Sequence, residues 1–146
     1  MTTPADESIL AGLQAEAGTW ARQHLADDLV GWLTTVAPDG RVQTSPISFL
    51  WEGSTILIYS KPNAPKLRNI AAHAQVSFNL NSDPYADHAL VIEGTAEVDM
   101  AVLPIDRHEA YAAKFREALA HWQIDGTEAR TYSVAVRITP TRIRAW

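Results

Sequence analysis

Cysteine is absent from this 146-residue chain, and lysine occupies only three of its 12 basic positions. The missing cysteine excludes disulfide scaffolds, Cys-ligated zinc, iron–sulfur clusters and cysteine nucleophiles. No run of about 18 apolar residues occurs, which excludes a membrane-spanning helix. The first residues lack a basic segment followed by an apolar core, so we expect no secretory signal and a cytoplasmic protein with no membrane partner.

Acidic residues are missing from one long segment. The chain carries 17 Asp and Glu residues and a net charge of −5, yet none of these residues lies between Gly53 and Ser82. The same segment holds Lys61, Lys66 and Arg68. An acidic chain is not typical of nucleic-acid binders, so we expect no nucleic-acid partner. A basic segment within it favours binding of a small anion, the alternative being a solvated surface.

The composition is that of a globular protein. Hydrophobic residues make up 47% and charged residues 20% of the chain, close to the average for soluble domains. No internal repeat, low-complexity tract or linker divides the sequence. We therefore expect residues 1–146 to form a single domain.

Hydrophobic periodicity, turn residues and prolines predict seven strands. They are expected at residues 31–37, 41–51, 55–60, 76–81, 89–99, 132–138 and 141–146. The first three strands are expected to form a meander that begins with a hairpin turn at residues 38–40. Pro46 requires a strand edge or a bulge, and Gly94 marks a further bulge. This pattern predicts a mainly β (α+β) fold, a closed or split barrel with a few peripheral helices.

Three helices are expected, at residues 6–28, from about residue 65 to 73, and at residues 106–121. Proline is favoured at the first helical position, which places one helix start at Pro65. Asp106 and Glu109 have the spacing of a capping box. The last helix presents one apolar stripe, formed by Tyr111, Phe115, Leu119 and Trp122. Lys114 is assigned to the exposed surface of the same helix.

Familiar catalytic and metal-binding patterns are missing from the sequence. No two of the five histidines are spaced by three or four residues, so no metal site is expected. Glu93, Glu97 and Asp99 share one face of a strand, which indicates a solvated face rather than a catalytic pair. There is no G-x-S-x-G elbow, Rossmann glycine pattern or Walker A loop. No residue is singled out as catalytic.

Four residues in the acid-free segment combine the groups that bind a phosphate. Tyr59 and Ser60 end a predicted strand, Lys61 follows, and Lys66 lies in the first turn of a predicted helix. The free N–H groups and the dipole of a helix N-terminus favour an anion. A lysine in the first turn is disfavoured by that dipole unless an anion compensates it. The alternative is an ordinary surface lysine at a helix start.

Three stretches carry a resemblance to a known family: GWLTTVAPDGRVQTSPISFLW, ILIYSKPNAPKLRNIAAHAQVSFNLN and VIEGTAEV. They resemble the pyridoxamine 5′-phosphate oxidase-like, flavin-binding split β-barrel family. The resemblance implies an FMN-binding split barrel of Greek-key type and a homodimer with cofactor sites at the subunit interface. It implies that Thr44, Ser45, Pro46 and Ile47 line the cofactor ring. It also implies that the phosphate is surrounded by Tyr59, Ser60, Lys61 and Lys66.

One difference between this sequence and the true oxidases of the family narrows the activity that we expect. The true oxidases carry Ser-Arg-Lys at the start of the phosphate helix, whereas this chain has Ala64-Pro65-Lys66. We therefore do not expect pyridoxamine phosphate oxidation. The stretches WLTTV-x-PDG, FLW-x-G-x-TILIYS and KLRNI are more similar to the actinobacterial branch that uses the deazaflavin coenzyme F420.

The resemblance to this branch implies an F420-dependent oxidoreductase. Such an enzyme passes a hydride between reduced deazaflavin and an unsaturated small organic molecule. The required proton could come from solvent, Tyr59 or Ser45. Three alternatives remain open on the sequence: an FMN-dependent oxidoreductase of the same family, a non-enzymatic flavin or haem carrier, and a barrel whose cofactor site has decayed.

Overall fold

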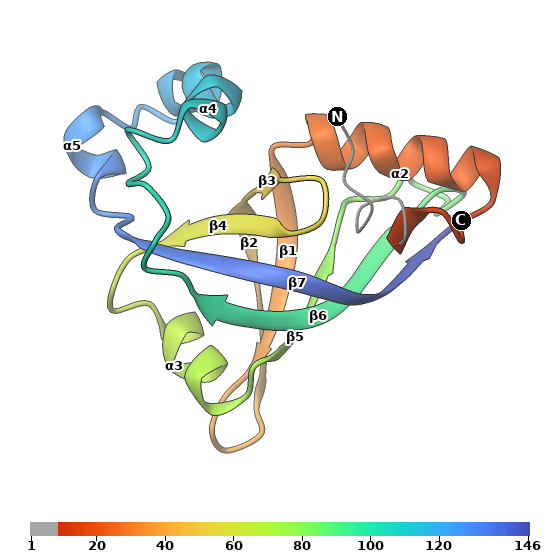
Figure 1. The fold of residues 1–146 in the computed structure, drawn as a ribbon, viewed down its shortest axis with the longest axis horizontal. Coiled ribbons are helices and arrows are strands. Elements are labelled where there is room, and N and C mark those ends of the chain that lie inside the picture. Colours follow the sequence, from red (N-terminus) through yellow and green to blue (C-terminus); the bar gives the residue numbers. More distant parts are fainter. Residues whose placement is uncertain (1–8) are drawn as a thin grey trace.

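The structure is a computed structural model that describes residues 9–146. Its centre is a seven-stranded antiparallel sheet in the order β2-β1-β5-β6-β7-β4-β3, which curls into a half-barrel (Figure 1). The strands are β1 Val30–Val36, β2 Val42–Ser48, β3 Leu50–Trp51, β4 Ile56–Ser60, β5 Gln75–Asn79, β6 Leu90–Val98 and β7 Val134–Ala145. The mainly β, split-barrel prediction is confirmed.

The helices lie at the ends and edges of the sheet (Figure 1). They are α2 Ala15–Asp27, α3 Pro65–Ala72, α4 Glu109–His121 and α5 Gly126–Ala129. The helix predicted at residues 6–28 is shorter, because a turn interrupts the chain at residues 11–12, where Gly12 lies. Residues 6–8 of that prediction lie outside the described part of the chain. Among the described residues, no helix is both long and apolar enough to cross a bilayer.

The interior of the half-barrel follows from the period-two burial of its strands. Inward-facing residues alternate with partly exposed ones along β1 and β6, as expected for strands with one face on a core. Phe49 and Phe78 meet edge to face inside, with ring centroids 5.0 Å apart. Both rings are fully buried. Buried aliphatic side chains of α2, α3, β1, β4, β5, β6 and β7 complete this core.

The predicted meander is wrong. The strand expected at residues 41–51 is broken at Phe49, and its two parts lie at opposite edges of the sheet. β2 pairs with β1, whereas β3 pairs with β4, and β4 continues to β7 rather than to β2. The break lets the buried Phe49 ring point into the core. Pro46 lies on the edge strand β2, opposite Trp32, as predicted.

The two strands predicted at residues 132–138 and 141–146 form one continuous strand, β7, which runs through Pro140. The register between β6 and β7 shifts at Glu93 and Gly94, so that Thr141 is the extra residue. The bulge predicted at Gly94 is therefore present, but its extra residue lies on the partner strand. A Cβ at Gly94 would come within 2.5 Å of the Thr139 carbonyl oxygen, so only glycine permits this approach.

The segment between β6 and β7 departs from prediction at both of its helices. α4 begins at Glu109 instead of residue 106, and its N-cap is His108, whose Nδ1 accepts a hydrogen bond from the Tyr111 amide at 3.2 Å. The predicted capping box is therefore wrong, because the imidazole replaces the Asp106 carboxylate. α5 occupies part of a predicted loop and is capped by Asp125, which accepts from the Glu128 amide at 2.8 Å.

Candidate functional site

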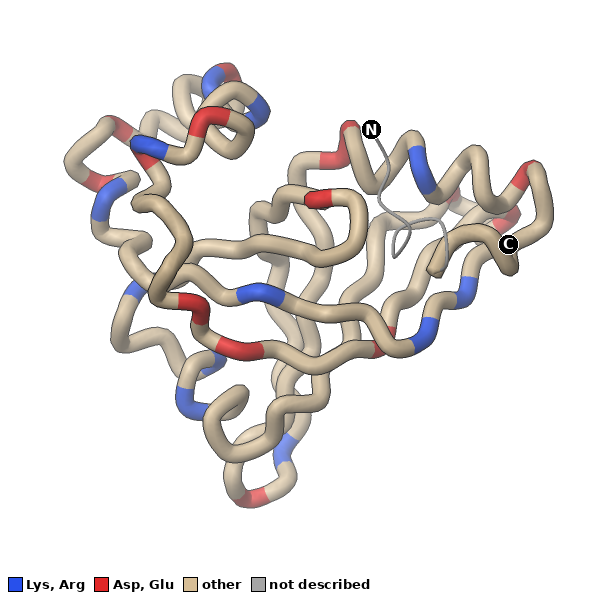
Figure 2. Tube along the Cα trace, viewed as in Figure 1, with Lys and Arg blue, Asp and Glu red and all other residues tan. Residues whose placement is uncertain are grey.

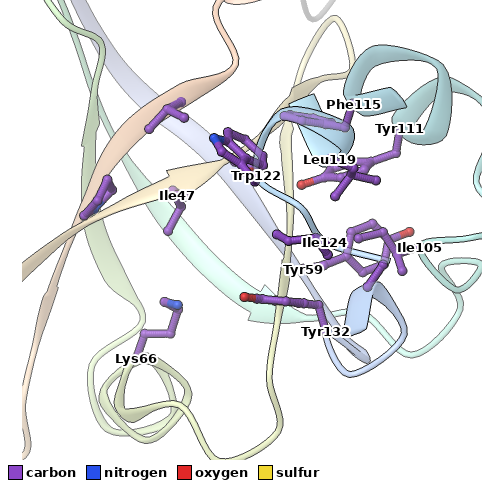
Figure 3. A pocket seen from close by; sticks show the side chains of 14 residues that line it. Ile47, Tyr59, Lys66, Ile105, Tyr111, Phe115, Leu119, Trp122, Ile124 and Tyr132 are labelled. Atoms are coloured by element: carbon purple, nitrogen blue, oxygen red, sulfur yellow. The ribbon is translucent and has the colours of Figure 1, made fainter. Parts of the chain in front are cut away.

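A pocket of about 470 Å³ lies between the sheet, α3 and the segment that carries α4 and α5 (Figure 3). The sheet contributes residues of β1, β2 and β4, α3 contributes a single cation, and the opposite wall is apolar and aromatic. The lining residues are Val30, Pro46, Ile47, Ser48, Tyr59, Lys66, Ile105, Tyr111, Phe115, Leu119, Trp122, Ile124, Ala129 and Tyr132. Its size and its mixture of apolar walls with a few polar groups are typical of small-molecule sites.

Lys66 is the charged group of this pocket, and its ammonium group points into the cavity (Figure 3). The side chain is half-buried, and burial lowers the pKa of its ammonium group. Within residues 9–146 no carboxylate pairs with it. A desolvated cation without a counterion is unfavourable until an anion binds, so the geometry favours an anionic ligand.

The N-terminus of α3 supports the same interpretation. Pro65 occupies its first turn, and the N-cap residue Ala64 makes no side-chain capping bond. No acidic residue lies in that turn, and α3 and the loop before it carry Lys and Arg but no Asp or Glu (Figure 2). The positive end of the helix dipole therefore adds to the Lys66 charge with no acidic side chain of its own turn to oppose it.

The aromatic wall is held in place by ring contacts and one short hydrogen bond. The Tyr59 hydroxyl donates to the Leu103 carbonyl oxygen at 2.6 Å. The Tyr111 ring meets the Tyr59 ring edge to face at 4.9 Å and stacks on Phe115 at 4.6 Å. Such pairs favour a fixed arrangement of rings over a mobile one. The wall is therefore a preformed apolar surface.

Two tyrosines of the pocket, Tyr59 on β4 and Tyr111 on α4, stay protonated at neutral pH. Burial, with a smaller contribution from Glu52, raises the pKa of Tyr59 to about 12 against the opposing effect of Arg137. Burial also raises the pKa of Tyr111, and the neighbouring Tyr59 adds to this shift. Neither phenol is therefore suited to act as a base, and the Tyr59 proton is already donated to Leu103.

Four of the eight residues predicted to bind a cofactor line the pocket: Pro46, Ile47, Tyr59 and Lys66. The other four lie outside its wall. Thr44 shares a hydrogen bond with Thr34 at 2.8 Å between the two hydroxyl oxygens, and Ser45 pairs with Leu33 across β1 and β2. Their role in cofactor binding stays a prediction.

The two remaining predicted residues, Ser60 and Lys61, have partners of their own. Ser60 is buried, and its hydroxyl donates to the Lys61 carbonyl oxygen at 2.9 Å. The Lys61 side chain is exposed, and its ammonium nitrogen lies 5.2 Å from the centroid of the Tyr132 ring. The structure therefore separates the two lysines that the sequence analysis grouped together, one inside the pocket and one at its outer rim.

The wall formed by α4 and the segment after it was not predicted from the sequence. The sequence feature that could have indicated this wall was the apolar stripe of the predicted helix, because the residues of that stripe line the pocket in the structure. Lys114 is not the free surface lysine that was expected. Its ammonium group donates to the Phe49 carbonyl oxygen at 2.8 Å and lies 4.1 Å from the centroid of the Phe49 ring. It attaches α4 to the break between β2 and β3.

The face predicted to be solvated is only partly so. Glu93 and Glu97 are exposed, but Asp99 is half-buried and pairs with Arg137. Arg137 also donates to both carboxylate oxygens of Glu52 at 3.0 Å. This arrangement joins β7 to the residues that directly follow β3 and β6. Among residues 9–146 no group of three or more His, Asp and Glu side chains is placed to hold a metal ion.

Comparison with known families shows to which family the chain belongs. The sequence profile of the pyridoxamine 5′-phosphate oxidase family matches residues 20–146. The chain belongs to this family. A search of curated proteins returned no match.

Solved structures show which relatives share the fold of this member of the pyridoxamine 5′-phosphate oxidase family. An F420 reductase is 25% identical, with a TM-score of 0.62 over 84% of this chain and 94% of that one. A FAD-binding protein of Mesorhizobium loti is 18% identical, with a TM-score of 0.66 over 91% and 94%. A haem storage protein of Vibrio cholerae is 16% identical, with a TM-score of 0.61 over 88% and 93%. At these identities the last two show the fold alone.

Proposed function

We propose that this protein is an F420-dependent oxidoreductase that transfers a hydride between reduced deazaflavin and an unsaturated small organic molecule. The observation that carries the proposal is Lys66, a half-buried cation in a largely apolar pocket, for which the described residues supply no counterion. Family membership and the F420 reductase among its structural relatives support a flavin-type cofactor. The sequence stretch KLRNI around Lys66 favours the deazaflavin.

The described residues fit such a cofactor. Lys66 and the uncapped start of α3 would hold its phosphate. Pro46 and Ile47 would contact the ring from the sheet, and the aromatic wall would exclude water from its far side. When bound, the cofactor supplies the hydride chemistry, and the protein supplies position and electrostatics. Among the residues that the structure describes, no acidic side chain lines the pocket, so we assign no catalytic acid.

We also propose that the protein acts as a homodimer. The edge strand β2 leaves Val42 67% exposed, and Thr44 and Ser45 lie on this strand outside the pocket described above. A second subunit over this edge would bring them toward a shared cofactor site. Light scattering at micromolar concentration should give twice the chain mass. A monomer that still binds the cofactor would contradict this proposal.

The cofactor proposal is tested by titrating the purified protein with oxidised F420 and with FMN, each followed by fluorescence quenching. We expect F420 to bind more tightly. Equal affinities, or tighter binding of FMN, would favour the FMN-dependent alternative. Haemin serves as a third ligand, because a haem storage protein shares the fold. Oxidation of reduced F420 on addition of an unsaturated acceptor then separates an enzyme from a carrier.

A further inference from the structure

Asn69 is a polar side chain buried beneath α3. It is 1% exposed, and its Nδ2 donates to Thr35 Oγ1 and to Gln43 Oε1, both at 3.0 Å. Thr35 on β1 and Gln43 on β2 are direct partners across the two strands. The amide therefore uses both of its hydrogens on one cross-strand pair. This arrangement attaches the helix to the sheet at a single, directional point.

The orientation of α3 depends on few contacts. The helix has eight residues, of which Asn69 and Ile70 are the buried ones. A helix of this length is not stable alone in water, and its N-cap residue Ala64 makes no side-chain capping bond. Ile70 is buried and Leu67 packs against the same core, but apolar contacts are non-directional, so they set the rotation of the helix less sharply. Hydrogen bonds are directional, so those of Asn69 set the rotation.

We propose that Asn69 is a positioning residue for the anion site: its hydrogen bonds to Thr35 and Gln43 fix the rotation of α3 that points Lys66 into the pocket. Lys66 precedes Asn69 by three residues, so the two side chains leave the same face of the helix, one turn apart. This inference rests on the proposed function, in which Lys66 binds the cofactor phosphate. Asn69 itself does not line the pocket.

The alternative is that Asn69 only satisfies buried polar groups and stabilises the fold. The two roles differ in what happens to Lys66. A positioning role requires that loss of the amide releases the Lys66 side chain to solvent. Its pKa, which burial lowers from the ordinary 10.5, would then return toward that value. A purely structural role lowers the stability of the protein and leaves the Lys66 pKa unchanged.

The experiment uses the small number of lysines in the chain. Lysine labelled with ¹³C at Cε gives three NMR signals, which Lys61→Arg, Lys66→Arg and Lys114→Arg assign one by one. We expect the Lys66 titration midpoint to lie below 10.5 in the parent and to rise in folded Asn69→Leu. An unchanged Lys66 midpoint in a folded variant would overturn the proposal. This readout needs no cofactor, so it remains decisive if F420 does not bind.

A second variant removes the same hydrogen bond from the opposite partner, in case Asn69→Leu does not fold. Thr35→Val takes away one acceptor of the amide without changing α3, and we expect the same direction of change. Thr34→Val is the matched control, because it breaks a side-chain hydrogen bond to Thr44 on the other face of the same strand. Equal effects of the two valine variants on the Lys66 midpoint would contradict the proposal.

Affinity provides a separate test of the same role. If the protein binds F420, Asn69→Leu should weaken binding by a factor similar to that of Lys66→Ala. In the Lys66→Ala background it should have no further effect, because it acts through the lysine. Independent, additive losses in the double variant would show that Asn69 does not act through Lys66.

Discussion

The two walls of the pocket are built in different ways. One wall consists of β2, β4 and α3. The two strands are joined to their neighbours by continuous backbone ladders, and the helix is attached to the sheet through Asn69. The opposite wall belongs to the connection between β6 and β7, whose helices α4 and α5 form no part of the sheet (Figure 1). Side chains attach it: Tyr111, Phe115 and Ala118 of α4 pack in one buried cluster with residues of β4 and β7. The Tyr59 bond to Leu103 and the Lys114 bond to Phe49 add two directional contacts.

The two walls therefore have different roles: the sheet wall recognises the ligand, and the aromatic wall encloses it. The sheet wall carries the charge that selects an anion, on a helix that the sheet orients. The aromatic wall carries no charged group and determines how well the ligand is shielded from water. Loops and helices attached by few contacts open more easily than core strands. Changes on the aromatic wall should therefore affect local stability, whereas changes on the sheet wall should affect affinity.

The largest effect is expected for Phe115→Ala on the aromatic wall. The Phe115 ring is 1% exposed and lies between Tyr111 and Trp122. Its removal should lower the free energy of unfolding of this region by about 3–5 kcal/mol. Amide hydrogen exchange should accelerate in α4 while the exchange of β5 and β6 stays unchanged. Equal acceleration in the sheet would show that the two walls unfold as one unit.

The next effect is expected for Lys66→Ala on the sheet wall. Loss of a charge-assisted contact should weaken cofactor binding by about 1.5–3 kcal/mol, roughly ten- to a hundredfold in Kd. The free energy of unfolding should hardly change, because a lysine in the first turn opposes the helix dipole. Lys61→Ala is the matched control, since it removes the same charge from an exposed position nearby. If both variants bind the cofactor as tightly as the parent, Lys66 has no role in cofactor binding.

Cofactor binding should also depend on pH through Lys66. Burial lowers the pKa of the free site, and a bound anion stabilises the ammonium form and raises it again. Above the lowered pKa, binding must take up a proton, so the affinity should fall as the pH rises. Titrations from pH 7 to 10 should show this decline in the parent and its absence in Lys66→Ala. A pH-independent Kd in the parent would contradict it.

Lys114→Met tests the attachment of the aromatic wall. It leaves the buried Phe49 carbonyl oxygen without its donor, which should lower the free energy of unfolding by about 1–3 kcal/mol near neutral pH. Burial lowers the pKa of Lys114 from 10.5 to about 8, although Asp28 and Asp27 oppose the shift. Between these two values the unfolded chain binds more protons than the folded protein.

The parent should therefore gain stability relative to Lys114→Met as the pH rises from about 8 to 10.5, and lose this gain as the pH falls through 8. Urea unfolding of both proteins at several pH values measures the difference. A constant difference across this window would mean that Lys114 keeps its charge in the folded protein at high pH.

The smallest effect is expected for Tyr59→Phe. The variant keeps the ring and its contact with Tyr111 but removes the hydrogen bond to Leu103. Loss of one such bond should lower the free energy of unfolding by about 0.5–1.5 kcal/mol. Hydrogen exchange near residue 103 should increase while cofactor affinity changes little. A large loss of affinity would instead give the Tyr59 hydroxyl a direct role at the ligand.

Local features of the chain predicted most of its elements. Alternating burial, the turn at residues 38–40 and Pro65 are short-range signals, and the strands and α3 lie close to where these signals place them. The strand break at Phe49 was not predicted, because its residues continue the β pattern on both sides. Which edge of the sheet each half joins depends on contacts distant in sequence, and no local pattern records them.

The sequence alone determined the family, the split barrel and the presence of a basic, acid-free segment that ends in a helix start. These follow from residue order and composition, which do not depend on how the chain packs. Only the tertiary structure decided that Lys66 enters the pocket while Lys61 stays at its rim, and that Lys114 binds a backbone carbonyl. Burial and hydrogen-bond partners are properties of the packed chain, since they are set by residues that lie far apart in sequence.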